Sequence, residues 1–237
     1  MTVATARHRR LLVTALVSLA VLGTAGCGSD DDDDAAAVGA VQLTPGPSPS
    51  VLVNRVALNP TDFPPKTKVK LVGGGDQVAG QVTLDFCGFN FTSEANRVAR
   101  RQVMILFPHA GKVLYSNEVV AYDSDAHAAA ALEEVRASVK ACRSSRLMGS
   151  TVAGVPDGRT VARQRTDRNL RVADNTVVTA AFTPRGSHRS FRQVMYYQRL
   201  GTVLSAVYFA TPGKPSKQQN HMARYMAQKT GFRLAAT

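Results

Sequence analysis

An apolar run near the N-terminus constrains this chain most, because it decides in which compartment the rest must fold. Met1–Arg10 carries three arginines and no acid, Leu11–Leu22 is apolar apart from two hydroxyl residues, and Gly23–Gly26 contains small residues. A positive segment, a short apolar segment and a small-residue site are typical of a secretory signal. The apolar run is about half the ~20 residues that a spanning helix needs. We therefore predict a signal peptide over residues 1–26.

The residue after this run is the first cysteine, Cys27, which follows Thr24-Ala25-Gly26. This stretch resembles the lipobox of bacterial lipoproteins, although those proteins usually have leucine where Thr24 stands. The resemblance implies cleavage before Cys27 and a diacylglycerol, with fatty acids such as palmitate, on its sulfur. Two acyl chains attach a protein firmly, whereas one binds only marginally. We expect a lipoprotein anchored extracytoplasmically on the outer face of the cell membrane. The alternative is an ordinary secretory signal with a chance cysteine.

Lipidation would leave two further cysteines, Cys87 and Cys142. An even pair in an oxidising compartment predicts a disulfide bond. Two free thiols or a metal-binding pair are the alternatives. The chain has no Cys-x-x-Cys and no nearby histidines at ligand spacing, so we expect no metal. No other cofactor motif is present, and we expect no cofactor.

Composition divides the exported chain into a tether and a basic domain. Residues 27–50 hold the acidic run Asp30–Asp34 and several prolines, which predicts a disordered acidic, Pro-rich tether. The whole chain still has a net charge of +12, so residues 51–237 are strongly basic. Basic domains usually bind nucleic acid, but an extracytoplasmic location argues against that partner. Anionic headgroups, wall polymers with phosphate or carboxylate, or an acidic protein partner are better candidates. Alternatively, the arginines only cover a solvated surface.

Hydrophobic periodicity predicts strands and helices in residues 51–237. Apolar residues of one helical face recur every three or four positions from Ala128 to Cys142, after the N-cap candidate Ser124. A second helix is expected over 217–230, ended by Gly231. The expected strands cover residues 66–72, 100–107, 113–115, 118–122, 160–166, 176–182, 191–199 and 201–210. This order predicts a single α+β domain, in which an antiparallel twisted sheet carries two main helices.

Several short stretches between Leu58 and Cys142 are similar to a known family. They are Leu58–Pro64, Asp85–Cys87, Ser93-Glu94 with Arg97, Arg100–Val103, Asn117–Val120 with Tyr122, and the helix that ends in Cys142. The chain resembles the extracellular sensor-domain lipoproteins of actinobacteria, which are related to the PknH-like outer domain of receptor Ser/Thr kinases. The resemblance implies one α+β domain with a groove that senses or binds an extracellular ligand. Kinase-linked members typically carry two disulfides, whereas this chain can form only one.

A polar group within the resembling region is the candidate ligand site. It consists of Glu94, Arg97, Arg101, Glu118 and Tyr122, with Arg100 beside them. Arginine can bind carboxylate or phosphate through two parallel hydrogen bonds. The alternative is structural, with Glu94 paired to Arg97, or Glu118 paired to an arginine.

The chain has neither of two common catalytic motifs, Gly-x-Ser-x-Gly and His-Glu-x-x-His. We therefore expect a ligand-binding or sensor-type module and no enzymatic activity. The alternative function is an envelope interaction protein that binds anionic polymers or a protein partner through its basic surface.

Overall fold

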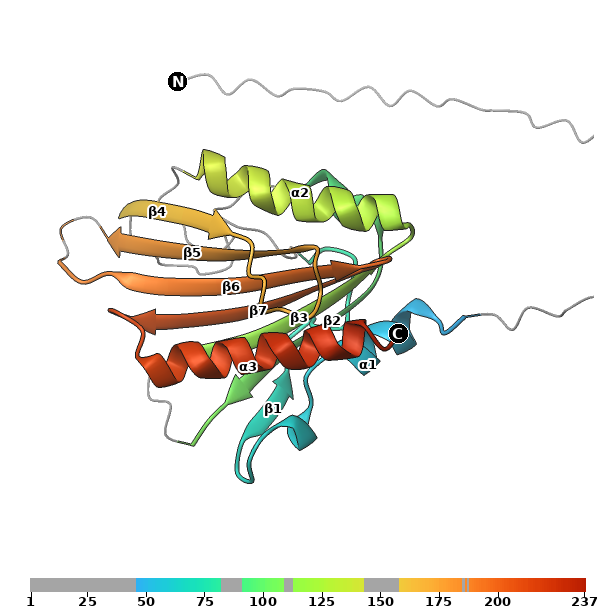
Figure 1. The fold of residues 1–237 in the computed structure, drawn as a ribbon, viewed down its shortest axis with the longest axis horizontal. Helices are drawn as coiled ribbons and strands as arrows, with labels where there is room; N and C mark the ends of the chain where they lie inside the picture. Colours follow the sequence, from blue (N-terminus) through green and yellow to red (C-terminus); the bar gives the residue numbers. More distant parts are fainter. Residues whose placement is uncertain (1–45, 82–90, 109–112, 143–157, 185, 187) are drawn as a thin grey trace, which may run out of the picture. The chain divides into compact units, whose positions relative to one another are not determined.

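Seven antiparallel strands form one sheet in the described part of the chain. The computed structural model describes residues 46–81, 91–108, 113–142, 158–184, 186 and 188–237. The strand order is β1-β2-β3-β7-β6-β5-β4 (Figure 1). The strands are β1 Lys68–Leu71, β2 Arg97–Leu106, β3 Leu114–Tyr122, β4 Gly158–Arg165, β5 Asn175–Pro184, β6 Phe191–Leu200 and β7 Val203–Pro212. The predicted antiparallel sheet and the single α+β domain are confirmed. The two short strands expected over 113–122 are one continuous strand, β3.

Three α-helices accompany the sheet in the described part of the chain: α1 Pro49–Val56, α2 Asp125–Ala141 and α3 Lys217–Leu234. The Ser124 hydroxyl accepts a hydrogen bond from the His127 amide and so caps α2 as predicted. Ser216 and Gln219 form a capping box at the start of α3. The sequence did not predict α1, whose first two residues lie within the expected tether. Two short 3-10 turns, η1 Pro60–Asp62 and η2 Thr92–Asn96, complete the elements.

The end of α3 differs from the prediction. Gly231 was expected just beyond the helix, but α3 continues to Leu234 and Gly231 lies inside it. A Cβ atom at Gly231 would lie only 2.3 Å from the side-chain oxygen of Gln198. Gln198 is fully buried and donates a hydrogen bond to the Ala227 carbonyl. The glycine is therefore required by the close approach of α3 to β6, and not by helix termination.

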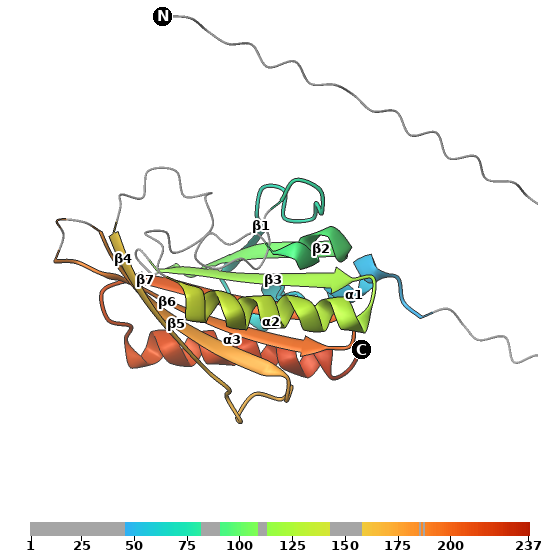
Figure 2. The ribbon, with the colours of Figure 1, turned by 90° about the horizontal axis from the view of Figure 1, so that it is seen from above.

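The helices lie on opposite faces of the sheet (Figure 1; Figure 2). Side chains alternate between the faces along each strand, so the neighbours Val119 and Val120 belong to different hydrophobic clusters. On the α2 face, Leu132 and Val135 pack with β3, β5, β6 and β7. On the α3 face, α3 packs over β6 and β7, while α1 packs near β2 and β3. The sheet therefore has two apolar layers, each covered by helix.

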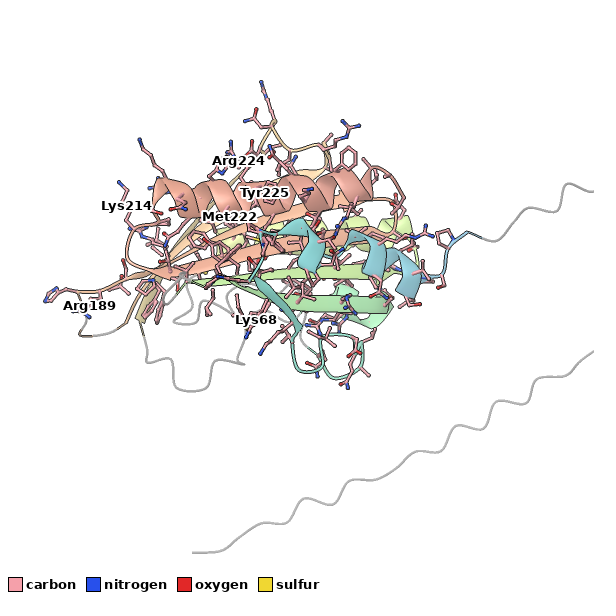
Figure 3. The ribbon with its side chains drawn as sticks, turned by 90° about the horizontal axis from the view of Figure 1, so that it is seen from below. Lys68, Arg189, Lys214, Met222, Arg224 and Tyr225 are labelled. Carbon is pink, nitrogen blue, oxygen red and sulfur yellow. The ribbon has the colours of Figure 1, made fainter. Side chains whose placement is uncertain are left out.

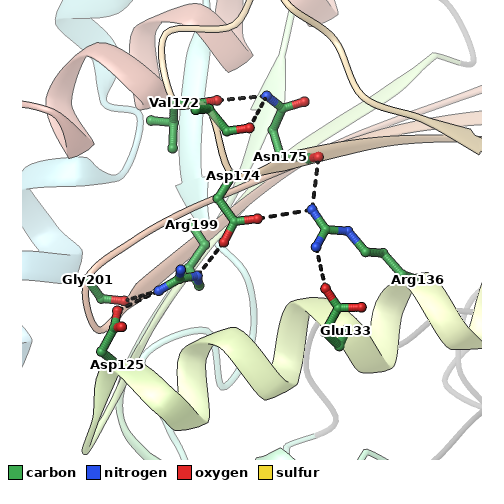
Figure 4. Close-up of polar contacts among 9 residues, drawn as sticks. Asp125, Glu133, Arg136, Val172, Asp174, Asn175, Arg199 and Gly201 are labelled. Atoms are coloured by element: carbon green, nitrogen blue, oxygen red, sulfur yellow. Dashed lines mark hydrogen bonds and ion pairs between the residues drawn. The ribbon is translucent and has the colours of Figure 1, made fainter.

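An ion-pair network fastens α2 to the sheet (Figure 4). Asp174, just before β5, accepts hydrogen bonds from Arg136 of α2 at 3.0 Å and from Arg199 of β6 at 2.6 Å. Arg136 also pairs with Glu133, and Arg199 with Asp125 at the start of α2. Burial alone would lower the pKa of Arg199. Its hydrogen bonds to Asp174 outweigh that effect, so the pKa of Arg199 is raised overall. The network thus fixes the position of α2 along the sheet.

The predicted signal peptide, lipidation site and first disulfide cysteine, with most of the predicted tether, lie outside the described residues. The signal peptide and Cys27 belong to residues 1–45, and Cys87 lies within 82–90. Cys142 is buried at the end of α2, on the α2 face as expected. Its pairing with Cys87 stays a prediction. In the described part of the chain, no helix is long and apolar enough to cross a membrane.

Candidate functional site

The polar group predicted from the sequence is centred on a buried ion pair. The Arg100 Nε atom lies 2.6 Å from Glu118 Oε1, and both side chains are 3% exposed. Arg100 also donates to the Gly74 carbonyl and to Gln102, while the Tyr208 hydroxyl donates to Glu118. Charges buried at this depth need such partners to offset their lost hydration. The geometry matches the structural alternative, in which Glu118 pairs with an arginine.

Two other predicted residues pair next to this cluster. Arg97 donates to the backbone carbonyl of Glu94 at 2.9 Å, and its side chain, 5% exposed, forms an ion pair with the Glu94 carboxylate at 3.7 Å. Tyr122 is buried beside them. Burial and the nearby Glu118 charge raise the pKa of Tyr122, which keeps its hydroxyl protonated. These side chains bind one another and offer little surface to a ligand.

Glu134 of α2 adds a further contact to this region. Its carboxylate accepts hydrogen bonds from the backbone amides and hydroxyls of Thr92 and Ser93, in η2. Burial opposes the charged form of Glu134, but the hydrogen bonds from Ser93 and Thr92 outweigh it and lower its pKa. The predicted cluster is thus held between η2, the sheet and α2.

Arg101 does not join the other predicted residues. It pairs in register with Val119, whereas Arg100 pairs with Val120. Because neighbouring strand residues point to opposite faces, Arg101 belongs to the α3 face and the cluster belongs to the α2 face. None of the cavities described below is lined by a predicted site residue. We therefore interpret the predicted cluster as structural.

A different site lies on the α3 face, where α3 covers β6 and β7 but leaves the outer strands β4 and β5 open. Two adjoining cavities of about 330 and 540 Å³ follow the edge of α3 and share the lining residues Thr179, Val194 and Asn220. We name this site the basic groove, formed by Arg163, Arg165, Thr179, Arg192, Lys214 and Arg224. Figure 3 shows Arg224 on α3 and Lys214 just before the start of that helix, with Met222 and Tyr225 toward β1 and Lys68.

One end of the basic groove contains its own counter-ion. Asp167 is 1% exposed and accepts from Arg224 at 2.9 Å and from Arg165 at 3.4 Å. Arg224 also contacts Tyr196 in the groove wall. Burial raises the pKa of Tyr196, and Arg224 opposes that rise. Asp167 therefore orients two cations and leaves this end of the groove with a net positive charge.

The remainder of the basic groove has unbalanced positive charge. Arg163, Arg192 and Lys214 are exposed, and no carboxylate in the described part of the chain lies within ion-pair distance of them. Arg163 and Arg192 line the same cavity, although they come from β4 and β6 on either side of β5. An anion above β5 would meet both guanidinium groups.

Sequence reasoning missed this site, but part of its signal was visible. Arg163 and Arg165 alternate along an expected strand, which places both on one face. Their convergence with Arg192, Lys214 and Arg224 depends on the strand order and on the path of α3. No local pattern contains that information.

A third cavity on the α3 face is mainly apolar. It has a volume of about 370 Å³ and lies between the start of α3 and the ends of β2 and β3, with Phe107, Tyr115 and Met222 in its lining. The ring of Tyr115 stacks on Phe209 at 5.0 Å between centroids. Burial raises the pKa of Tyr115 to about 12. This cavity lacks cationic side chains among its lining residues and differs in chemistry from the basic groove.

Comparisons with known proteins find a likeness at the level of structure. No family model and no curated protein matches the chain. The structure is similar to the crystal structure of the extracellular domain of PknH from Mycobacterium tuberculosis, with 12% sequence identity and a TM-score of 0.48. The match covers 79% of this chain and 98% of that chain.

Proposed function

We propose that the mature chain is a lipid-anchored, extracytoplasmic and non-enzymatic module that binds an anionic ligand in the basic groove. The observation that carries this proposal is the set of exposed cations, Arg163, Arg192 and Lys214, around one cavity. Like charges held close together repel one another, so their clustering costs stability unless an anion neutralises them. The signal-like N-terminus and Cys27 support the extracytoplasmic address.

Binding is tested by titrating the purified chain with anionic fragments of a bacterial envelope. Saturable binding is expected, with a large loss in the Arg163→Ala/Arg192→Ala double variant. A matched double variant, Arg55→Ala/Lys140→Ala, removes two exposed charges on α1 and α2 that do not line the groove, and it should bind normally. Equal losses in both variants would contradict a localised site.

The second candidate function is an interaction protein held by its overall charge. The high net charge of the chain favours it. Exposed charges are screened over about 8 Å at physiological salt, so this candidate predicts weak binding that disappears between low and physiological salt. Binding that saturates at one site in physiological salt supports the groove instead.

The anchor is tested separately by metabolic labelling with a fatty-acid analogue. We expect the label on the native chain and none on Cys27→Ser, because the thioether needs the cysteine sulfur. A label that persists in the variant would contradict the lipoprotein assignment.

A further inference from the structure

The floor of the basic groove is narrow and made of small residues. Thr179 and Ala181 of β5 point to the α3 face, where Thr179 pairs in register with Arg163 of β4 and Ala181 pairs with Arg192 of β6. Adjacent strands lie about 4.8 Å apart, so β4 and β6 are separated by roughly 10 Å. A lane one strand wide, with an arginine on each side, therefore runs over β5.

The lane is longer than one small anion needs. The two cavities that share Thr179 extend from Arg165 and Arg224 at one end to Lys214 at the other. Cations thus occur at both ends and on both sides. This arrangement fits an extended chain with several negative charges better than one isolated anion.

The directions of the donors distinguish two classes of anionic group. A carboxylate is planar, and one arginine can satisfy it through two parallel hydrogen bonds. In the lane, Arg163 and Arg192 line one cavity from strands on either side of β5, and the exposed residue Thr179 lies on the floor between those strands. Donors from three directions suit the tetrahedral oxygens of a phosphate group.

We infer that the lane over β5 binds a chain of phosphate groups, as in polyphosphate or a phosphodiester polymer, with one phosphate held by Arg163, Arg192 and Thr179. This inference rests on the proposed function, because it names the class of anion that the basic groove takes. Arg224 and Lys214 would meet neighbouring phosphates along the chain.

The test compares short-chain polyphosphate with polyglutamate of matched charge, using the purified full chain in detergent at about 0.15 M salt. Polyphosphate should bind saturably and more tightly than polyglutamate. Arg163→Ala and Arg192→Ala should each weaken polyphosphate binding about tenfold or more, as expected for a lost charged hydrogen bond. Arg55→Ala should leave the affinity unchanged. Thermal unfolding of each variant shows whether the variant is folded.

Thr179→Val separates phosphate recognition from general attraction. It should weaken polyphosphate binding about tenfold, because the hydroxyl donates to an ionised phosphate oxygen, and leave polyglutamate binding unaltered. Equal affinities for both polymers, both dependent on Arg163 and Arg192, would overturn the phosphate inference and leave the proposed function standing.

Two further outcomes are distinguishable. Uniform weakening in all charge variants, Arg55→Ala included, would overturn both the inference and the proposed function. Binding to vesicles that contain phosphatidylglycerol, without binding to free polyphosphate, would show that the phosphates belong to a lipid surface and would overturn the polymer as the occupant.

Discussion

Removing the carboxylate of Glu118 tests whether the predicted polar cluster is structural. Glu118→Ala would leave the Arg100 guanidinium buried, with the Gly74 carbonyl and the Gln102 side chain as its remaining partners among the described residues. Breaking a buried ion pair by removing one partner typically costs about 3–5 kcal/mol. For a domain of this size, a loss of 1 kcal/mol lowers the melting temperature by about 2–4 °C. The expected decrease is therefore about 6–20 °C.

Thermal and urea unfolding of the purified chain measure this loss. The exposed Glu133, 67% accessible and paired with Arg136, provides the matched control. Glu133→Ala should cost about 1 kcal/mol or less, as surface ion pairs do. A double variant, Arg100→Met/Glu118→Leu, should recover most of the stability, because hydrophobic replacement of a buried pair is often neutral or stabilising by about 1–4 kcal/mol. A loss below about 1 kcal/mol for Glu118→Ala would refute the reasoning.

Three further predictions concern other parts of the fold. Gly231→Ala should destabilise the chain by about 1–3 kcal/mol through overpacking against Gln198, and urea unfolding measures this loss. In an exposed helix the same substitution stabilises by up to about 1 kcal/mol. The pKa of Glu134 is lowered in the fold, so this carboxylate should contribute stability that is complete above its unfolded pKa of about 4.3 and is lost as pH falls through the lower folded pKa. Glu134→Gln should therefore make the free energy of unfolding less dependent on pH in this acidic range. An unchanged pH dependence would contradict the role of Glu134. Mass spectrometry of the denatured, non-reduced chain should find Cys87 and Cys142 protected from alkylation, and two alkylated thiols would refute the disulfide.

Local sequence signals predicted most of the regular structure. Ser124 and the apolar repeat after it defined α2, because a cap and a helical face are both encoded within a few residues. The helix α1 was missed because its residues follow directly on a proline-rich tether. Gly231 was misread because the contact that requires a glycine comes from Gln198, which lies on a strand far away in the sequence.

The candidate site was harder to predict than the fold. Arg100 and Arg101 are neighbours in an expected strand, so strand alternation alone places them on opposite faces. Grouping Arg101 with Glu118 and Tyr122 ignored that constraint. The basic groove depends on β4, β5 and β6 being adjacent, and on α3 leaving the outer strands open. These are global properties of the fold, which composition and spacing do not encode.

Chemical-shift mapping by NMR locates a bound anion in the fold without relying on any substitution. Short-chain polyphosphate is titrated into the isotope-labelled chain at physiological salt. We predict saturating shifts in β4, β5 and β6 around Arg163, Thr179 and Arg192, and at the start of α3, if the anion binds in the basic groove. Shifts centred on Arg97 and Tyr122 on the α2 face, or small shifts spread over all exposed cations, would contradict this prediction.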